Sequence, residues 1–134
     1  DNVSFYTAAV NDIDQNQVFS LLVDTLINKN DLLIYLSGSG NSLNLIKAAM
    51  KAKLIGIKQA CITAFTGGKL LDLVDIPIHI KISDMEIAED CQIAIFHYIK
   101  QALCIDIQSD GGVEFEDSIN SNRYNKRVGG DEIA

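Results

Sequence analysis

The sequence has few cysteines, few basic residues and no long apolar run, and each shortage excludes a class of protein. Its 3 cysteines are odd in number and lie outside any Cys-x-x-Cys motif, which argues against a disulfide framework or a thiolate zinc site. With 11 basic against 18 acidic residues, the formal charge of −7 disfavours partners such as nucleic acid or an anionic membrane. No apolar run approaches the roughly 20 residues of a membrane span, and no signal segment is recognisable. These features favour a cytoplasmic protein.

The segment 31–54 has the clearest organisation in the chain. A short apolar run, Leu32 to Leu36, is typical of a buried strand. From Leu43 onward, apolar residues recur at helical spacing, which indicates an amphipathic helix. Between the two lies the polar turn Ser37-Gly38-Ser39-Gly40-Asn41-Ser42. A strand, a serine and glycine loop and a helix start therefore coincide.

This loop has the composition of a phosphate site. The first N–H groups of a helix lack partners and carry partial positive charge, so an anion is stabilised there. Glycines permit close approach of the backbone, and the hydroxyls of Ser37, Ser39 and Ser42 can donate to phosphate oxygens. The loop is neither a Walker loop nor Gly-x-Gly-x-x-Gly, which disfavours a nucleotide. Taken alone, it fits a capped turn without a ligand equally well.

The remaining pattern predicts alternating strands and helices. A parallel α/β sheet with helices on both faces, in three α/β/α layers, is the expected fold, and 134 residues suit one domain. Asn11 and Asp12 then follow a strand and share the carboxyl edge of the sheet with the serine loop. The predicted elements are strands at 3–10, 57–65 and, at an edge, 76–82, and helices from Asp14, at 69–74 and, largely buried, from Met85 to about Ala102.

The segment after Cys104 is poorer in apolar residues than the rest of the chain. It contains several glycine and asparagine breaks, and we expect residues 104–134 to be extended or partly disordered. Val113 and Phe115 are candidates for one short extra strand or contact. The predicted organisation is therefore a domain over 1–103 followed by a tail.

Two titratable residues share one side of the last predicted helix. Glu89 and His97 are eight residues apart, so their Cα atoms would lie about 12 Å apart, and a metal ion or a substrate would have to bridge them. From spacing alone, a core histidine bonded to a backbone carbonyl is the favoured interpretation of His97. His79, on the polar face of its strand, is expected to be exposed. Cys61 and Cys91 are interpreted as packing residues rather than nucleophiles.

Three runs of the sequence resemble one known family. These are DLLIYLSGSGNSLNLIKAAMKAKLIGI, CITAFTGGKLLDLVDIPIHI and EIAEDCQIAIFHYIKQAL. They are similar to the sugar isomerase (SIS) domain, specifically its phosphoheptose isomerase branch, whose members show a Ser-Thr-Ser-Gly-Asn-Ser loop and a final helix ending in His. The resemblance covers residues 1–103. It implies an aldose–ketose isomerase acting on sedoheptulose 7-phosphate, with a flavodoxin-like three-layer fold, assembled as a homotetramer.

The resemblance also assigns roles to individual residues. It implies that the loop positions Ser37, Gly38, Ser39 and Ser42 bind the sugar phosphate and that Asn11 and Asp12 contact substrate. Glu89 takes the place of a family glutamine that contacts substrate and zinc. His97 takes the place of a histidine that binds zinc and moves protons, and so becomes the leading catalytic candidate, with Glu89 beside it.

Departures from the family pattern leave alternatives open. Gly38 replaces a threonine and Glu89 replaces a glutamine, which adds negative charge near a phosphorylated substrate. The family's preceding Gly-rich phosphate loop, and the His and Glu that complete its metal site, find no match, so we expect the chain to be the C-terminal part of a longer protein. A non-catalytic SIS module that binds a sugar phosphate or docks a partner protein, or a scaffold with an empty loop, remains the alternative.

Overall fold

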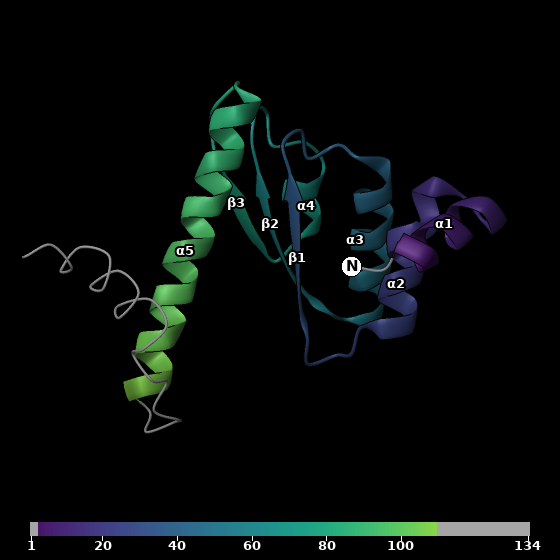
Figure 1. The fold of residues 1–134 in the computed structure, drawn as a ribbon, viewed down its shortest axis with the longest axis horizontal. Coiled ribbons are helices and arrows are strands. Elements are labelled where there is room, and N and C mark those ends of the chain that lie inside the picture. The colour runs from purple at the N-terminus through teal and green to yellow at the C-terminus, as the bar shows by residue number, and fades with distance from the viewer. Residues whose placement is uncertain (1–2, 110–134) are drawn as a thin grey trace, which may run out of the picture. The chain divides into compact units, whose positions relative to one another are not determined.

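The computed structural model describes residues 3–109 and divides the chain into two compact units, Asp1–Ile93 and Ala94–Ala134. The first contains three strands and most of the helices, and the last helix begins in it and continues into the second (Figure 1). The elements are α1 (Val3–Asp12), η1 (Gln15–Gln17), α2 (Val18–Leu26), β1 (Leu32–Ser37), α3 (Leu43–Ile55), β2 (Lys58–Thr63), α4 (Leu70–Leu73), β3 (Ile76–His79) and α5 (Met85–Ser109).

The three strands form an open parallel sheet in the order β1-β2-β3. The register pairs Tyr35 with Cys61 and places the last residues of the strands, Ser37, Thr63 and His79, in one row. The parallel sheet is confirmed, and so is the edge position of β3, which contains Pro77. Because parallel strands end at the same edge, the loops after β1 and β2 are neighbours.

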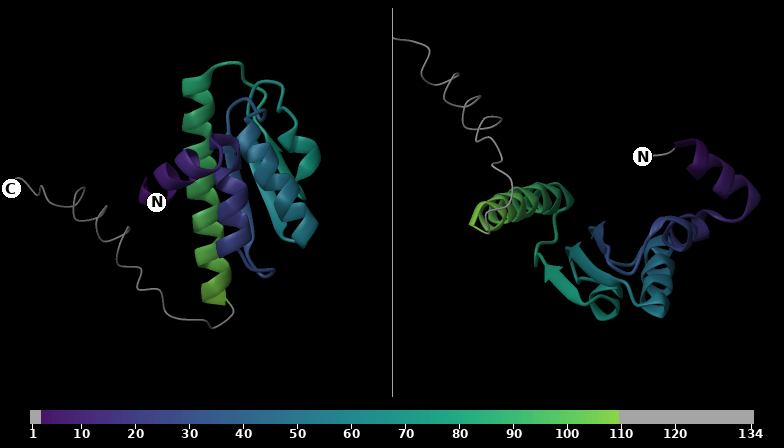
Figure 2. Two further views of the ribbon diagram at one scale, coloured as in Figure 1. Left: turned by 90° about the vertical axis from the view of Figure 1, so that its right-hand side faces the viewer. Right: turned by 90° about the horizontal axis from the view of Figure 1, so that it is seen from below.

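Helices lie on both faces of this sheet. Figure 2 shows α3 and α4 on one side. On the other side, the first turns of α5 approach β2, where Gln92 Nε2 donates to the carbonyl oxygen of Ile62 at 3.4 Å and Ala88 is fully buried. Asp84 Oδ1 accepts from the Ile87 amide at 3.0 Å and so caps α5. The α/β/α architecture is confirmed.

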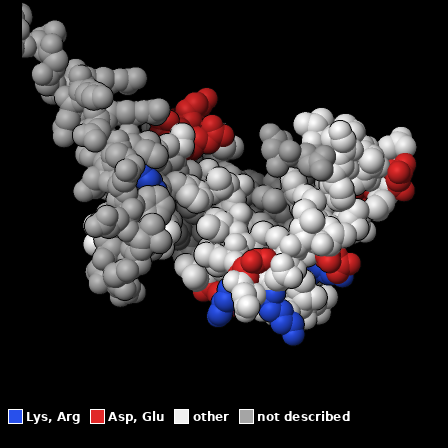
Figure 3. Space-filling model, turned by 60° about the horizontal axis from the view of Figure 1, so that its bottom comes forward, with Lys and Arg blue, Asp and Glu red and all other residues white. Residues whose placement is uncertain are grey.

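Three ion pairs join elements of the first unit at its surface. Figure 3 shows basic and acidic groups close together on the face that it draws. Solvent screens exposed pairs of this kind, so they support the packing rather than determine it. The pairs are Lys47–Asp14 at 3.5 Å, Lys51–Asp24 at 2.8 Å and Lys58–Asp75 at 3.3 Å.

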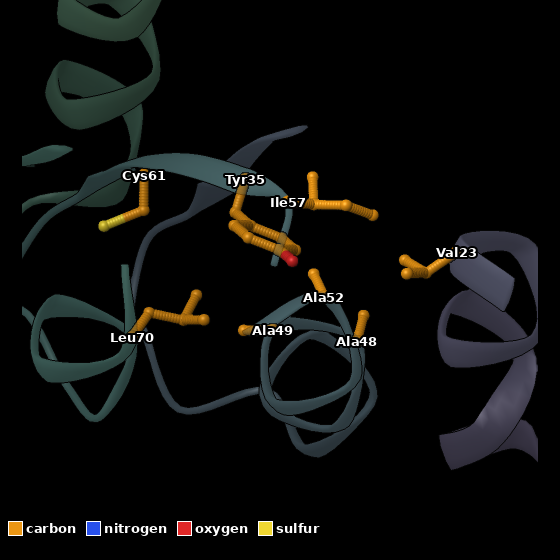
Figure 4. Packing of buried hydrophobic residues seen from close by; sticks show 8 residues of the cluster. All are labelled: Val23, Tyr35, Ala48, Ala49, Ala52, Ile57, Cys61 and Leu70. Atoms are coloured by element: carbon orange, nitrogen blue, oxygen red, sulfur yellow. The ribbon is translucent and has the colours of Figure 1, made fainter. Parts of the chain in front are cut away.

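The core of the first unit lies between β1, β2 and α3. Ala48, Ala49 and Ala52 form the buried face of α3, and their small side chains allow the helix to approach Tyr35 of the sheet (Figure 4). Gly56, with φ of 77°, ends the helix in the left-handed conformation. The predicted helix is confirmed, and Met50 on it is exposed.

A buried hydrogen bond inside this core gives the first testable prediction. The Tyr35 hydroxyl donates to Gln59 Oε1 at 2.7 Å, and burial raises the pKa of Tyr35. Tyr35→Phe leaves the buried Gln59 carbonyl without its donor, so we expect the free energy of unfolding to fall by about 1–3 kcal/mol. Urea denaturation measures it, with Tyr6→Phe on the exposed part of α1 as control. An equal loss in both variants would contradict this account.

The strand predicted at residues 3–10 is wrong, because this segment is helix α1. Its β-branched and aromatic residues suggested a strand, but β propensity depends on packing partners. Here only Ala9 is buried, so the segment lacks the covered faces that a central parallel strand needs. The Thr7 hydroxyl instead donates to the Val3 carbonyl at 3.0 Å, a bond between residues one helical turn apart.

The last helix also differs from its prediction. α5 extends to Ser109, beyond the expected end near Ala102 and past the predicted start of the tail at residue 104. Ile93 and Tyr98 are exposed, so the expectation that this part of the helix is largely buried is wrong for them. Val113 and Phe115 lie outside the described residues. Among residues 3–109, no helix combines the length and apolar character that a bilayer crossing requires.

Candidate phosphate-binding site

The serine loop follows β1 directly and is folded by its own side chains. Ser37 Oγ accepts from the Gly40 amide at 3.1 Å, and Ser39 Oγ accepts from the Asn41 amide at 3.2 Å. A hydroxyl that accepts from an amide keeps its own hydrogen for donation. Ser37 is buried at the end of the strand, whereas Ser39 and Ser42 are exposed. The bonds that shape the loop therefore leave its hydroxyl hydrogens available to a ligand.

A second glycine turn, Thr66-Gly67-Gly68, packs against this loop. The Gly40 carbonyl accepts from the Leu70 amide at 3.1 Å, and Asn41 Oδ1 accepts from the Lys69 amide at 3.1 Å. Gly40 has φ of 64°, and a Cβ on it would lie 1.9 Å from the Gly67 carbonyl oxygen. Only glycine fits there. No local pattern in the sequence indicates this contact, although both loops follow neighbouring parallel strands.

His79 holds the start of the glycine turn. Its Nε2 lies 2.9 Å from the carbonyl oxygen of Phe65, so this nitrogen carries a hydrogen and donates it. Phe65 has φ of 51°, a left-handed conformation that costs a non-glycine residue free energy. His79 is half-buried, and its expected exposure is wrong. The histidine therefore stabilises a strained residue next to the loop.

The N-termini of two helices lie at the serine loop. α3 begins directly after it, and its N-cap residue Ser42 makes no capping hydrogen bond with its side chain. α5 begins at Met85, whose Sδ lies 2.6 Å from the position of a Cβ built on Gly38. Helix N-termini carry partial positive charge and unpaired N–H groups. The backbone charge of these helix ends therefore stabilises an anion at the loop.

Asn11 and Asp12 do not follow a strand. They end helix α1, both are exposed, and Asn11 Nδ2 donates to Asp12 Oδ1 at 2.8 Å. The expectation that they lie at the carboxyl edge of the sheet fails because the element before them is a helix. Their contact with a substrate stays a prediction of the family resemblance.

Glu89 and His97 both lie on α5 and both are exposed. The interpretation of His97 as a core histidine is therefore wrong. Glu89 belongs to the first compact unit and His97 to the second, so their joint approach to the serine loop stays a prediction. Among residues 3–109, no three His, Cys, Asp or Glu side chains group as metal ligands do. The described residues alone do not form a zinc site, and zinc stays an expectation from the resemblance.

The cysteines of the described region are free thiols. Cys61 is fully buried in β2, and burial raises the pKa of its thiol. A raised pKa keeps the thiol protonated and unreactive. Cys61 thus packs the core, as the sequence interpretation holds, and Cys91 is half-buried.

Comparison with known proteins gives consistent matches. No family model matches the sequence. Phosphoheptose isomerase of Helicobacter pylori strain P12 is 36% identical over 98 residues, which are 73% of this chain and 51% of that protein. The Aliarcobacter butzleri protein of the same name is 36% identical over 102 residues, or 76% of this chain and 54% of that protein. The chain spans about half the length of the curated relatives it matches.

Solved structures of two proteins resemble the chain in three dimensions. A phosphoheptose isomerase from Francisella tularensis superimposes with a TM-score of 0.69 and 26% identity, over 72% of this chain and 54% of that one. The enzyme of that name from Neisseria gonorrhoeae gives a TM-score of 0.73 and 27% identity, over 75% and 57% of the two chains. Sequence and fold therefore both match proteins named phosphoheptose isomerase.

Proposed function

Because the chain belongs, over the residues that these alignments cover, to the phosphoheptose isomerase family of the SIS fold, we propose that it acts as a sugar-phosphate isomerase. In this proposal the loop Ser37–Ser42 holds the phosphate of sedoheptulose 7-phosphate, which is converted to a heptose 7-phosphate. The observation that carries it is the loop itself, in which serine hydroxyls with free hydrogens lie beside two helix N-termini.

The chemistry of the loop suits a phosphate monoester. Such a group has several anionic oxygens and needs several donors, which the hydroxyls of Ser37, Ser39 and Ser42 supply. The partial positive charge at the N-termini of α3 and α5 favours the negative charge. Asn41 is already engaged through its side chain with Ser39 and Lys69, so it shapes the loop rather than binding the ligand.

Isomerisation of a ketose phosphate needs one acid and one base. A base removes a proton from C1, the electrons of that C–H bond form the C1=C2 bond, and the carbonyl electrons move to O2, which takes a proton to give the enediol. Loss of the O1 proton then makes C1 the aldehyde carbon as a proton is added to C2. We assign the proton transfer to His97, since histidine is the residue type most used for such steps. Glu89 positions the substrate. Asn11 and Asp12 contact the sugar. In the same proposal the chain assembles as a homo-oligomer, expected to be a tetramer.

Removal of one loop hydroxyl tests phosphate binding. Ser42→Ala deletes a donor at the start of α3 and should raise the Kd for sedoheptulose 7-phosphate about 5- to 100-fold, because a hydrogen bond to a charged group is worth about 1.5–3 kcal/mol and part is recovered by water. Isothermal titration calorimetry measures it, with Ser4→Ala on the exposed face of α1 as control. Equal affinities in the wild type and both variants would remove Ser42 from the site.

A second candidate is an SIS module that binds the sugar phosphate without converting it. Glu89 favours this candidate, because the resemblance leads one to expect a neutral glutamine and a carboxylate repels a phosphorylated ligand. The test uses protein purified from its natural source. If calorimetry shows that it binds sedoheptulose 7-phosphate and an activity assay shows no isomerisation, the second candidate is selected.

A further inference from the structure

Glycine is required at position 38 because a neighbouring side chain occupies the space next to it, and not because of its backbone conformation. Its φ is not positive, unlike those of Gly40, Gly67 and Gly68, so the conformation itself would accept a side chain. A Cβ on Gly38 would lie 2.6 Å from Met85 Sδ, 2.8 Å from Met85 Cε and 3.7 Å from Phe65 Cε2. The volume that a side chain at position 38 would take is therefore filled by the end of Met85.

We propose that Met85 is a specificity-determining residue of the phosphosugar site: its thioether takes the place of a side chain at Gly38 and contacts the carbon atoms next to the bound phosphate. This inference rests on the proposed function. Met85 opens α5, and the Asp84 cap on Ile87 fixes where that helix begins. Gly38 is fixed as well, because its carbonyl accepts from the Ala64 amide at 2.8 Å. The two residues thus meet at a defined place.

The chemistry of Met85 decides which part of a ligand it contacts. A thioether has no hydrogen to donate and is a weak acceptor, so it offers nothing to phosphate oxygens. It does offer a polarizable apolar surface to C–H groups. Met85 is 42% exposed, so it reaches the loop while part of the side chain still faces solvent. Phosphate is held by the serines, and the adjacent carbon chain packs on Met85.

A pair of ligands separates these two contacts. Met85→Ala should raise the Kd for sedoheptulose 7-phosphate about threefold to tenfold, the equivalent of losing a few buried methylene contacts. The Kd for inorganic phosphate, which has no carbon, should stay within about twofold. Met50→Ala, which removes an exposed methionine from α3, is the matched control and should change neither Kd.

The double substitution tests whether Gly38 and Met85 form a matched pair. Gly38→Ser should weaken sedoheptulose 7-phosphate binding, because its Cβ displaces the flexible end of Met85. In Gly38→Ser with Met85→Ala, the two losses should not add, since the displaced group is already absent. If the Kd of the double variant rises by the product of the two single increases, as it does for independent sites, the pairing is overturned.

Methyl NMR gives a direct reading, because Met50 and Met85 are the 2 methionines of the chain. In the full chain labelled at methionine methyl groups and at backbone nitrogen, sedoheptulose 7-phosphate should shift the Met85 methyl and the amides of residues 37–42, and leave the Met50 methyl unchanged. Loop amides that shift while the Met85 methyl does not would overturn the Met85 proposal and leave the proposed function intact. Loop amides that stay in place at saturating ligand would overturn both.

Discussion

Gly40→Ala is expected to separate the two loops of the site and to lower the free energy of unfolding by about 3 kcal/mol. The φ of 64° costs an alanine about 1 kcal/mol or more. In addition, the new Cβ would lie 1.9 Å from the Gly67 carbonyl oxygen, a backbone atom that cannot move aside as a side chain does. Urea denaturation measures the stability, and calorimetry should show the loss of sedoheptulose 7-phosphate binding.

Gly56→Ala provides the matched control for this substitution. Gly56 has φ of 77°, yet a Cβ on it meets no heavy atom within 4 Å. Its replacement should therefore cost only the conformational strain of a left-handed alanine, about 1 kcal/mol, and leave ligand affinity unchanged. If Gly40→Ala and Gly56→Ala lost the same free energy of unfolding, this account would be contradicted. The requirement for glycine at position 40 would then not come from the packing of the glycine turn against the serine loop.

His97→Ala is expected to lower the rate of isomerisation about 100- to 10,000-fold, the usual contribution of a general acid or base. Affinity for sedoheptulose 7-phosphate should change little, because the serine loop holds the phosphate. The measurement compares the turnover rate and the calorimetric Kd of His97→Ala with those of the wild type, both purified from the natural source. This combination separates a proton-transfer role from a purely structural one, which would lower stability or affinity instead.

Lys100→Ala is the control for His97→Ala. Lys100 is exposed on the same helix, so its replacement tests whether any change on α5 slows the reaction. We expect its turnover to match that of the wild type. Full activity of His97→Ala would exclude His97 from proton transfer, and an equal loss in both variants would assign the effect to the helix.

The sequence was sufficient to predict the elements next to the loop. β1, the serine loop and α3 follow from local signals, because an apolar run, a polar turn and a helical period succeed one another within segment 31–54. The expected burial of β1 is wrong on one face, where Leu32, Ile34 and Leu36 are exposed. Gly56 likewise ends α3 through a local signal, because glycine readily takes the left-handed conformation. These features depend on short-range backbone chemistry, which the order of the residues specifies directly.

Features that depend on tertiary neighbours were not predictable in the same way. The two histidines show this. His97, which spacing alone places in the core, is exposed, and His79, expected in solvent, donates to the carbonyl of Phe65. Nothing near His79 in sequence signals that Phe65 adopts a left-handed conformation. The strand-like composition of residues 3–10 gave a wrong prediction for a related reason. A residue's β propensity depends on packing against neighbouring strands, which the local sequence does not specify.

A ligand-bound crystal structure tests the central claim most directly. Crystals of the full chain grown with saturating sedoheptulose 7-phosphate should show its phosphate within hydrogen-bond distance of the hydroxyls of Ser39 and Ser42, at the N-terminus of α3. A phosphate bound elsewhere on the protein, with the serine loop occupied only by solvent, would contradict the account.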